Sequence, residues 1–520
     1  MNPTKNLAFR VVVIFVATSA IPVGLTAQDG RDHRHRPHHY QLVDMGTLGG
    51  PQSYIADVGV PGGRFVNNRG VLTGYSDTST PDPFPSNCFN PDCFVAHAFR
   101  WQDGFMTDIG AERFDLSSAS AWISENGLIA GFAENGEIDP VTTFPELHAA
   151  LWQNGGITDL GALPGGYESV ANSVNSRGQV VGASVNAIPD PNTLADLTFN
   201  FVFSTNQLRA IVWQDRVMQD LGTLGGPDSL ALLNNERGQV MGWSYISATK
   251  AGVCFPLAIG SFIWEKEKGM RDLGSLGGGT CTLASDLNKR GQVVGYGVPA
   301  GDTFLRAFLW EDGSIRDLGG SLGGSSTGAF VVNDAGHAAG FAAVAGDYFY
   351  HAALWKRIGQ ITDLGTIGSD PCSSAKAINA KGQVVGDSIS LSNCQTNGDA
   401  SRAFLWEDGV IFDLNALIPA GSPLHLIHPQ NINDRGEIAG LGVDASGHQH
   451  AFLLIPCDEV HPGREGCDYS LVGPIPAVEA APAESAHPSG GRNTQSGFRD
   501  RLHDLMRGRN PKPVVLRTGQ

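Results

Sequence analysis

The sequence is poor in charge, and above all in positive charge. Charged residues make up 17% of the chain, and 35 Lys and Arg stand against 52 Asp and Glu, which gives a formal net charge of −17. Binding to nucleic-acid phosphates needs a basic surface, so nucleic acid is excluded as an expected partner. Scarce Lys and Glu also disfavour long solvent-exposed helices. The 67 glycines indicate many short strands joined by tight turns instead.

Catalytic and cofactor motifs are missing as well. The sequence has no GxSxG, HExxH, P-loop or dinucleotide-binding glycine pattern in a convincing context, and none of its cysteines stands in a CxxC. No EF-hand spacing is present either. We therefore predict no catalytic residues, no cofactor and no metal site, and we favour a binding role over catalysis.

Long apolar runs are also lacking, apart from one at the N-terminus. Lys5 and Arg10 precede "VVVIFVATSAIPVGL", and "LTA", which ends at Ala27, offers a cleavage site. This is the pattern of an export signal over residues 1–27. An uncleaved anchor is the alternative, although the run is short for a membrane helix. We expect a secreted chain with no membrane span after signal removal, which begins with a His/Arg-rich leader over residues 28–39.

The eight cysteines fit an exported protein, because disulfides persist in oxidising compartments. The sequence alone allows about 105 pairings. We favour pairing between sequence neighbours, because each bridge would then close one loop. The predicted disulfides are Cys88–Cys93, Cys254–Cys281, Cys372–Cys394 and Cys457–Cys467.

A glycine-punctuated phrase recurs along the chain, as in "VNSRGQVVGAS" and "INAKGQVVGDS". Asn at its first turn position and Gly at the fourth favour a type I turn, and the β-favouring residues that follow predict a strand. Each copy is therefore a β-hairpin. The turns begin at Asn67, Ser124, Asn175, Asn235, Asn288, Asn333, Asn379 and Asn433.

Two further phrases follow the hairpins, one resembling "HAFLW" and one resembling "TDLGTLGG". Each unit then offers about four strands, which is typical of a propeller blade. The last unit lacks the "DLG" phrase, whereas an orphan copy, "YQLVDMGTLGG", opens the mature chain at Tyr40. Pairing of these two ends would remove exposed sheet edges. The sequence predicts an all-β fold over residues 40–456, an eight-bladed β-propeller closed by the N-terminal strand; an open solenoid is the alternative.

The combination of "GQVVG", "AFLW" and "DLG" resembles the HAF family of extracellular repeat proteins, named after a His-Ala-Phe triplet. The triplet stands here at His97–Phe99 and His450–Phe452. The resemblance covers roughly Tyr40 to Pro456. It implies export and a repetitive β architecture, and it implies no established activity.

A basic residue opens the "HAFLW" strand in most units, and an Asp recurs in the "DLG" strand. A ring of basic side chains could bind an anionic glycan. The favoured interpretation is structural, because antiparallel neighbours would pair each His or Arg with an Asp of its own blade. The predicted pairs are His97–Asp108, His148–Asp159, Arg209–Asp220, Arg306–Asp317, His351–Asp363, Arg402–Asp413 and His450–Asp44.

Variable loops separate each hairpin from the "HAFLW" strand, and they share one face with the "TLGG" connections. Aromatic residues beside acids suit a glycan, although packing within the loops is the alternative. We expect a monomer whose loop face binds an extracellular glycan or protein; a secreted polysaccharide lyase or hydrolase is the alternative function. The predicted ligand-face residues are Phe84, Phe89, Phe94, Phe199, Phe201, Phe203, Phe255, Tyr348 and Tyr350.

The repeat stops after Pro456. Residues 457–470 form a short Cys-containing segment, and the composition of residues 471–520 predicts a disordered tail. Within it, "FRDRLHDLMRGR" has the apolar spacing of one short helix.

Overall fold

The computed structural model describes residues 39–55, 63–85, 88–111, 113, 115–139, 145–190, 193, 206–394, 401–458, 461 and 467. The predicted export signal, nearly all of the leader, most of the 457–470 segment and the predicted tail lie outside them. The described residues form β-strands, together with the short 3-10 turns η2 (Leu276–Gly278) and η4 (Leu414–Ala416). Among them, no helix has the length and apolar character needed to cross a membrane.

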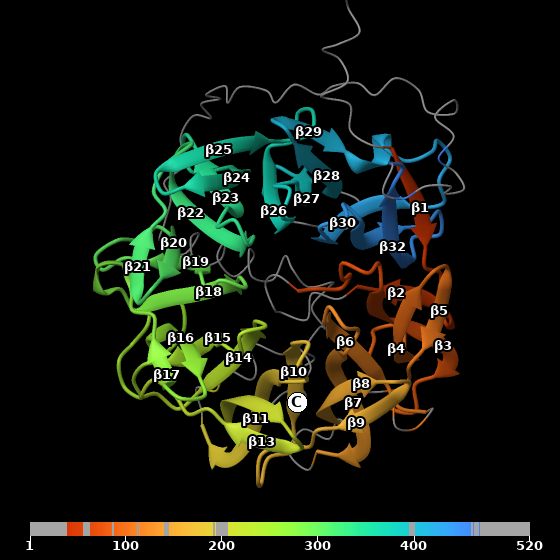
Figure 1. Cartoon of the computed structure of the whole chain (residues 1–520), viewed down its shortest axis with the longest axis horizontal. Coiled ribbons are helices and arrows are strands. Elements are labelled where there is room, and N and C mark those ends of the chain that lie inside the picture. The colour runs from red at the N-terminus through yellow and green to blue at the C-terminus, as the bar shows by residue number, and fades with distance from the viewer. Residues whose placement is uncertain are drawn as a thin grey trace, which may run out of the picture. The chain divides into compact units, whose positions relative to one another are not determined.

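The strands pair in groups of four that follow chain order (Figure 1). The first groups are β2 (Gly49–Tyr54), β3 (Leu72–Pro81), β4 (Phe94–Gln102) and β5 (Phe105–Asp108); β6 (Ser118–Ile123), β7 (Ile129–Ile138), β8 (Pro145–Gln153) and β9 (Gly156–Asp159); β10 (Ser169–Val174), β11 (Val180–Pro189), β12 (Asn206–Gln214) and β13 (Val217–Asp220). Two groups follow that share one eight-stranded sheet, joined by a parallel contact of Ile259 with Cys281. They are β14 (Ser229–Asn234), β15 (Val240–Tyr245), β16 (Ile259–Glu265) and β17 (Gly269–Asp272); β18 (Cys281–Leu287), β19 (Val293–Val298), β20 (Arg306–Glu311) and β21 (Ser314–Asp317).

The remaining groups lie in the C-terminal half of the chain. They are β22 (Gly323–Val332), β23 (Ala338–Val344), β24 (Tyr350–Arg357) and β25 (Gln360–Gly365); β26 (Cys372–Ile378), β27 (Val384–Ile389), β28 (Ser401–Glu407) and β29 (Val410–Asp413); β30 (His425–Ile432), β31 (Ile438–Val443) and β32 (Gln449–Pro456). The predicted all-β fold of four-stranded units is therefore confirmed.

The N-terminal strand completes the last of these sheets. β1 (Tyr40–Asp44) runs antiparallel to β32, with Tyr40 opposite Pro456 and Asp44 opposite Phe452. In Figure 1 the red β1 accordingly lies beside the blue β32. The pairing predicted between the orphan N-terminal phrase and the last unit is confirmed.

The recurring Asn and Gly build each hairpin turn. The side-chain Oδ1 of Asn175 accepts hydrogen bonds from the N–H groups of Arg177 and Gln179. Gly178 has a φ of 76°, which glycine adopts without steric cost. The second glycine of the phrase serves close packing, because a Cβ on Gly182 would lie 1.9 Å from the carbonyl oxygen of Val170. The first glycine is therefore required by the turn conformation, and the second by the close approach of the first strand.

A serine in the first strand links several of the groups to the preceding one. Ser169 Oγ accepts a hydrogen bond from the N–H of Ala149 at 2.8 Å and donates one to the carbonyl of Gly161 at 2.6 Å. N–H to Oγ bonds of the same kind join Ala210 to Ser229, Ala352 to Ser373 and Ala451 to Ser53. The last bond places β32 against β2, so the last and first groups are neighbours.

All four predicted disulfides are confirmed. They join Cys88 to Cys93, Cys254 to Cys281, Cys372 to Cys394 and Cys457 to Cys467. The first three hold loops that leave a second strand, and the last follows β32. Because such bridges persist in oxidising surroundings, they fit a protein that works outside the cytosol.

Candidate binding cavity

Most of the predicted His/Arg–Asp pairs are present and structural. Their nitrogen–oxygen distances lie between 2.8 and 3.0 Å, and the basic side chains are largely buried. A side chain already paired and buried between two strands has little left to offer a ligand. The pairs are His97–Asp108, His148–Asp159, Arg209–Asp220, His351–Asp363 and His450–Asp44.

Two predicted pairs are wrong. Arg306 lies 3.7 Å from Asp302 instead of pairing with Asp317, and Arg402 lies 2.6 Å from Asp370 instead of pairing with Asp413. An arginine reaches further than a histidine, and in both units a connecting loop supplies a carboxylate within that reach.

The two unpaired acids have local roles of their own. Asp317 accepts the N–H of Gly319, and Asp413 accepts the N–H of Asn415 at the start of η4. Each carboxylate therefore stabilises the turn that follows its strand.

The predicted ligand-face aromatics come from separate loops. Phe89 is buried against Tyr75 and Phe132, so its prediction as a ligand contact is wrong. Tyr350 donates its hydroxyl to the carbonyl of Cys394 and packs on Phe341. Phe84, Phe94 and Phe255 are partly buried, and Tyr348 is 45% exposed. Phe199, Phe201 and Phe203 lie outside the described residues.

A cavity of about 150 Å³ lies at the ends of the first strands, beside the hairpin turns. We call it the first-strand cavity. Each first strand runs into its turn, and the second strand runs back to the variable loop, as β10 and β11 do. The cavity and the variable loops therefore lie at opposite ends of the strands. Its polar lining includes Arg64, Asn68, Glu125, Glu236, Asp286, Lys289, Asp334, Lys376, Asn431 and Asp434.

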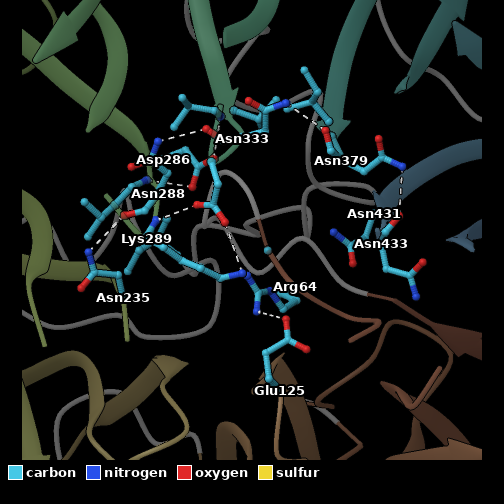
Figure 2. Close-up of a pocket in the computed structure, with 18 of the residues that line it drawn as sticks. Arg64, Glu125, Asn235, Asp286, Asn288, Lys289, Asn333, Asn379, Asn431 and Asn433 are labelled. Atoms are coloured by element: carbon cyan, nitrogen blue, oxygen red, sulfur yellow. Dashed lines mark hydrogen bonds and ion pairs between the residues drawn. The ribbon is translucent and has the colours of Figure 1, made fainter. Parts of the chain in front are cut away.

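Side-chain amides connect the turns around this cavity. Each donates its Nδ2–H to a backbone carbonyl of the next turn, at 2.8–3.1 Å. The series runs from Asn67, Asn126, Asn175, Asn235, Asn288, Asn333 and Asn379 to Asn433, which donates back to Asn67. Figure 2 labels Asn235, Asn288, Asn333, Asn379 and Asn433 of this series at the cavity. The turns that frame it are thus fixed to one another.

The residue after the first turn position is acidic in alternate turns. Its carboxylate accepts the N–H of the corresponding residue in the preceding turn, which is not acidic. The acceptors are Glu125 from Asn68, Glu236 from Ser176, Asp334 from Lys289, and Asp434 from Ala380. Among the described residues, no group of three or more His, Cys, Asp or Glu is arranged to hold a metal ion.

Arg64 enters the cavity from the segment that precedes the first turn. Its guanidinium lies 2.8 Å from Glu125, toward which it points in Figure 2. It also lies 5.5 Å from the centre of the Trp122 ring, in the range of a cation–π contact. Lys289 forms a second ion pair with Asp334 at 3.2 Å. Both cations are therefore compensated, while hydrogen-bonding capacity remains on their side chains.

Asp286 is the acid in the cavity wall whose environment is most unusual. Its carboxylate accepts the N–H groups of Leu287 and Val332 at 2.8 and 2.7 Å. Burial raises its pKa to about 7, against the lowering effect of these hydrogen bonds. No cation among the described residues lies within ion-pair distance of it. Asp286 can therefore change its charge near neutral pH.

Neither Arg64 nor Asp286 is among the site residues predicted from the sequence. Arg64 lies in an insertion between Tyr54 and Asn67 that the other units lack. Asp286 stands two residues before Asn288, where Trp122 and Leu233 stand before their own turns. Alignment of the eight copies with one another would have revealed both departures.

Comparison with known proteins identifies no family and finds only distant structural likeness. No family model and no curated protein matches this sequence. Similar solved structures include the β-propeller domain of the Trilobed protease from Pyrococcus furiosus, at 11% identity and a TM-score of 0.38, covering 65% of this chain and 95% of that one. An ulvan lyase of polysaccharide lyase family PL25 has 11% identity and a TM-score of 0.35, covering 71% and 96%. A Trypanosoma rangeli sialidase has 10% identity and a TM-score of 0.29, covering 80% and 58%. At these TM-scores we transfer no fold, ligand or activity from these proteins to this chain.

Proposed function

We propose that the protein is a closed β-propeller of eight blades that binds a saccharide in the first-strand cavity. Counting the eight-stranded sheet as two blades joined at one residue pair, and β1 with β30–β32 as one blade, gives the count of eight. The hydrogen bonds from Asn433 to Asn67 and from Ala451 to Ser53 support closure. The resemblance to the HAF family agrees with this architecture.

The observation that carries the binding role is the mixed lining of the cavity. Arg64 and Lys289 supply donors, and Glu236 and Asp434 supply carboxylate acceptors, a mixture that suits the adjacent hydroxyl groups of a sugar ring. A cavity of about 150 Å³ is smaller than the roughly 300–1,000 Å³ of sites for drug-sized ligands. It therefore accommodates one unit of a longer ligand.

The place of action that we propose is extracellular. Four disulfides need an oxidising compartment to persist, and the N-terminal sequence has the pattern of an export signal. A saccharide on a cell surface or in the surrounding matrix is available to such a protein.

The face of the variable loops is a second candidate surface. Ile188, at the end of β11, is 54% exposed and Tyr348 is 45% exposed, and exposed apolar side chains favour a protein partner. A protein bound there would occupy the ends of the strands opposite to the cavity.

A lyase or hydrolase is the alternative activity, and it would need a carboxyl pair that substrate can reach. Burial and the neighbouring Asp92 carboxyl raise the pKa of Asp77 to about 8, which makes these two acids the candidate pair. Asp77 is fully buried, however, so this pair is closed to a glycan. For this reason we favour binding over cleavage.

Titration calorimetry against oligosaccharides chosen from a glycan array tests the proposal. We expect wild type to bind at least one saccharide, and Arg64→Ala to weaken that binding about tenfold or more. The control is Lys266→Ala, which changes an exposed lysine in the β16–β17 turn. Absence of binding to every saccharide at millimolar concentration, or equal effects of the two substitutions, would contradict the proposal.

A further inference from the structure

A buried charge cluster lies where the other sheets place apolar side chains. Asp387 of β27 stands opposite Ala403 of β28. In the other sheets, the residue in this register is apolar or aromatic and is buried. These residues are Tyr75, Phe132, Ala183, Trp243, Tyr296, Phe341 and Leu441. Asp387 therefore breaks the repeat inside the core.

Two basic residues hold the Asp387 carboxylate. Its Oδ1 lies 3.1 Å from His428 Nδ1, and its Oδ2 lies 3.4 Å from Lys376 Nζ. The Asp387 side chain is only 1% exposed. Burial acts to raise its pKa, but the charges of Lys376 and His428 outweigh burial and lower it. Desolvation commonly offsets the gain from such a buried pair, so stability alone does not explain its presence.

Lys376 places this cluster at the first-strand cavity. It is the extra residue of a β-bulge between Ala375 and Ala377 in β26, and it lines the cavity. The bulged residues of the other first strands carry no charge. They are Ala121, Asn172, Leu232, Ser285, Phe330 and Gln430. A lysine at this position is thus specific to one side of the cavity.

The ammonium of Lys376 keeps donors for a ligand. The side chain is 11% exposed, and its 3.4 Å contact with Asp387 exceeds the roughly 2.7–2.9 Å of a charge-assisted hydrogen bond. Among the described residues, Asp387 is the one acceptor near its Nζ. An ammonium carries three N–H donors, so at least two of them remain beyond the contact with Asp387.

We propose that Lys376, positioned by Asp387 and His428, anchors the ligand of the first-strand cavity, and that this ligand is a neutral saccharide bound through a hydroxyl or acetamido oxygen. This inference rests on the proposed function and names the ligand class of the same site. Lys376 supplies the donors, and Asp387 keeps the ammonium in place and cancels its charge.

The charge balance of the cavity selects against anionic sugars. Each lining cation has a carboxylate partner, Arg64 with Glu125, Lys289 with Asp334, and Lys376 with Asp387. No cation among the described residues pairs with Asp286, Glu236 or Asp434. The lining therefore has excess negative charge, which repels a uronate or a sulfated sugar and leaves a neutral sugar unaffected.

Calorimetry with matched oligomers tests the inference on the full chain. The probes are N-acetylglucosamine and mannose oligomers, with uronate oligomers of equal length. We expect wild type to prefer neutral oligomers, and Lys376→Met to weaken their binding about tenfold or more. Lys381→Met, which removes an exposed lysine from the turn after β26, is expected to stay within about twofold of wild type.

Asp387→Asn gives a readout that a purely structural role would not produce. With its charge uncompensated, Lys376 should attract anions, so the ratio of neutral to uronate affinity should fall about tenfold. If Asp387→Asn does not fold, the double variant Asp387→Phe/Lys376→Met, which has an aromatic residue there as other sheets do, should fold and fail to bind.

The possible failures are distinguishable. If no saccharide binds wild type, the proposed function is wrong. If Arg64→Ala loses binding while Lys376→Met retains it, the function stands and Lys376 is not the anchor. If wild type prefers uronate oligomers, the assignment of a neutral ligand is wrong.

Discussion

His450 Nδ1 lies 2.9 Å from Asp44 Oδ1, although 406 residues separate them in the sequence. The pair joins β32 to β1. The hydrogen bond that His450 donates to Asp44 is the main cause that raises the pKa of His450. Burial acts to raise the pKa of Asp44, but the hydrogen bonds from His450 and from the N–H of Gly46 outweigh it and lower that pKa. The two ends of the chain are thus held by a charge pair as well as by a strand ladder.

The first prediction concerns this pair. A histidine whose pKa is raised in the folded state contributes stability that is complete below its unfolded pKa and is lost as pH rises through the folded value. His450→Ala should therefore lower the free energy of unfolding by about 1–2 kcal/mol at pH 5.5, and by less at pH 8.5. Urea unfolding at both pH values measures this. His448→Ala, at an exposed neighbour, is the control, and an equal loss at both pH values would contradict the assignment.

The second prediction concerns the amide series around the cavity. Asn379 donates its Nδ2–H to the carbonyl of Asn433 at 3.0 Å, and its Oδ1 accepts the N–H groups of Lys381 and Gln383. Asn379→Asp keeps the acceptor and loses the donor, so it should cost about 1–2 kcal/mol, and Asn379→Ala should cost more because it loses both. Thermal unfolding orders the two variants. If Asn379→Asp were as stable as wild type, the link between turns would contribute nothing.

The third prediction concerns alkaline pH. Burial raises the pKa of Glu168 to about 9, and the nearby acids Asp139 and Glu146 add to this effect. The folded state therefore binds a proton that the unfolded state has released, and stability falls as pH rises from about 5 to 9. Glu168→Gln should be more stable than wild type at pH 8.5 by about 2 kcal/mol or more. Asp115→Asn, at an exposed acid, should leave the slope of stability against pH unchanged in this range.

The fourth prediction concerns ligand binding. Asp286, with a pKa of about 7, changes from a carboxylic acid to a carboxylate near neutrality. An ionised acceptor forms hydrogen bonds roughly twice as strong as a neutral one, so saccharide affinity should rise between pH 6 and 8. Asp286→Asn should remove this rise while the variant still binds. Calorimetry across this pH range would contradict the role of Asp286 if the variant and wild type showed the same slope.

Local features were predictable from the sequence because neighbouring residues specify them. Asn175 and Gly178 define a turn by themselves, and the disulfides join cysteines close in sequence. Contacts between blades were harder to predict from the sequence. The Asn175 amide reaches the carbonyl of Asn235, and no local pattern encodes a bond across 60 residues. Arg402 was assigned the wrong acid because reach and loop geometry decide its partner.

The candidate site was missed for a related reason. The predicted ligand-face residues lie in long variable loops, whereas the cavity lies where the repeat changes by single residues. Lys376 and Asp387 each replace an uncharged residue inside a well-kept phrase, so neither changes the length or the hydropathy of its unit. The two side chains meet across adjacent strands of one unit, at a bulge in β26 that the sequence pattern does not reveal.

The alternation of acidic and non-acidic residues after the first turn position has a consequence for copy number. Asp434 accepts the N–H of Ala380, and its own N–H donates to Asn68 Oδ1, so the alternation is consistent where the chain returns to its start. An alternating pattern can be continuous between the last and the first turn only if the number of four-stranded units is even. Removal of a single four-stranded unit would bring together two turns that both carry an acidic residue after the first position, or two turns that both lack one. Duplication or deletion of modules in pairs preserves the pattern, so variants of this architecture should gain and lose modules two at a time.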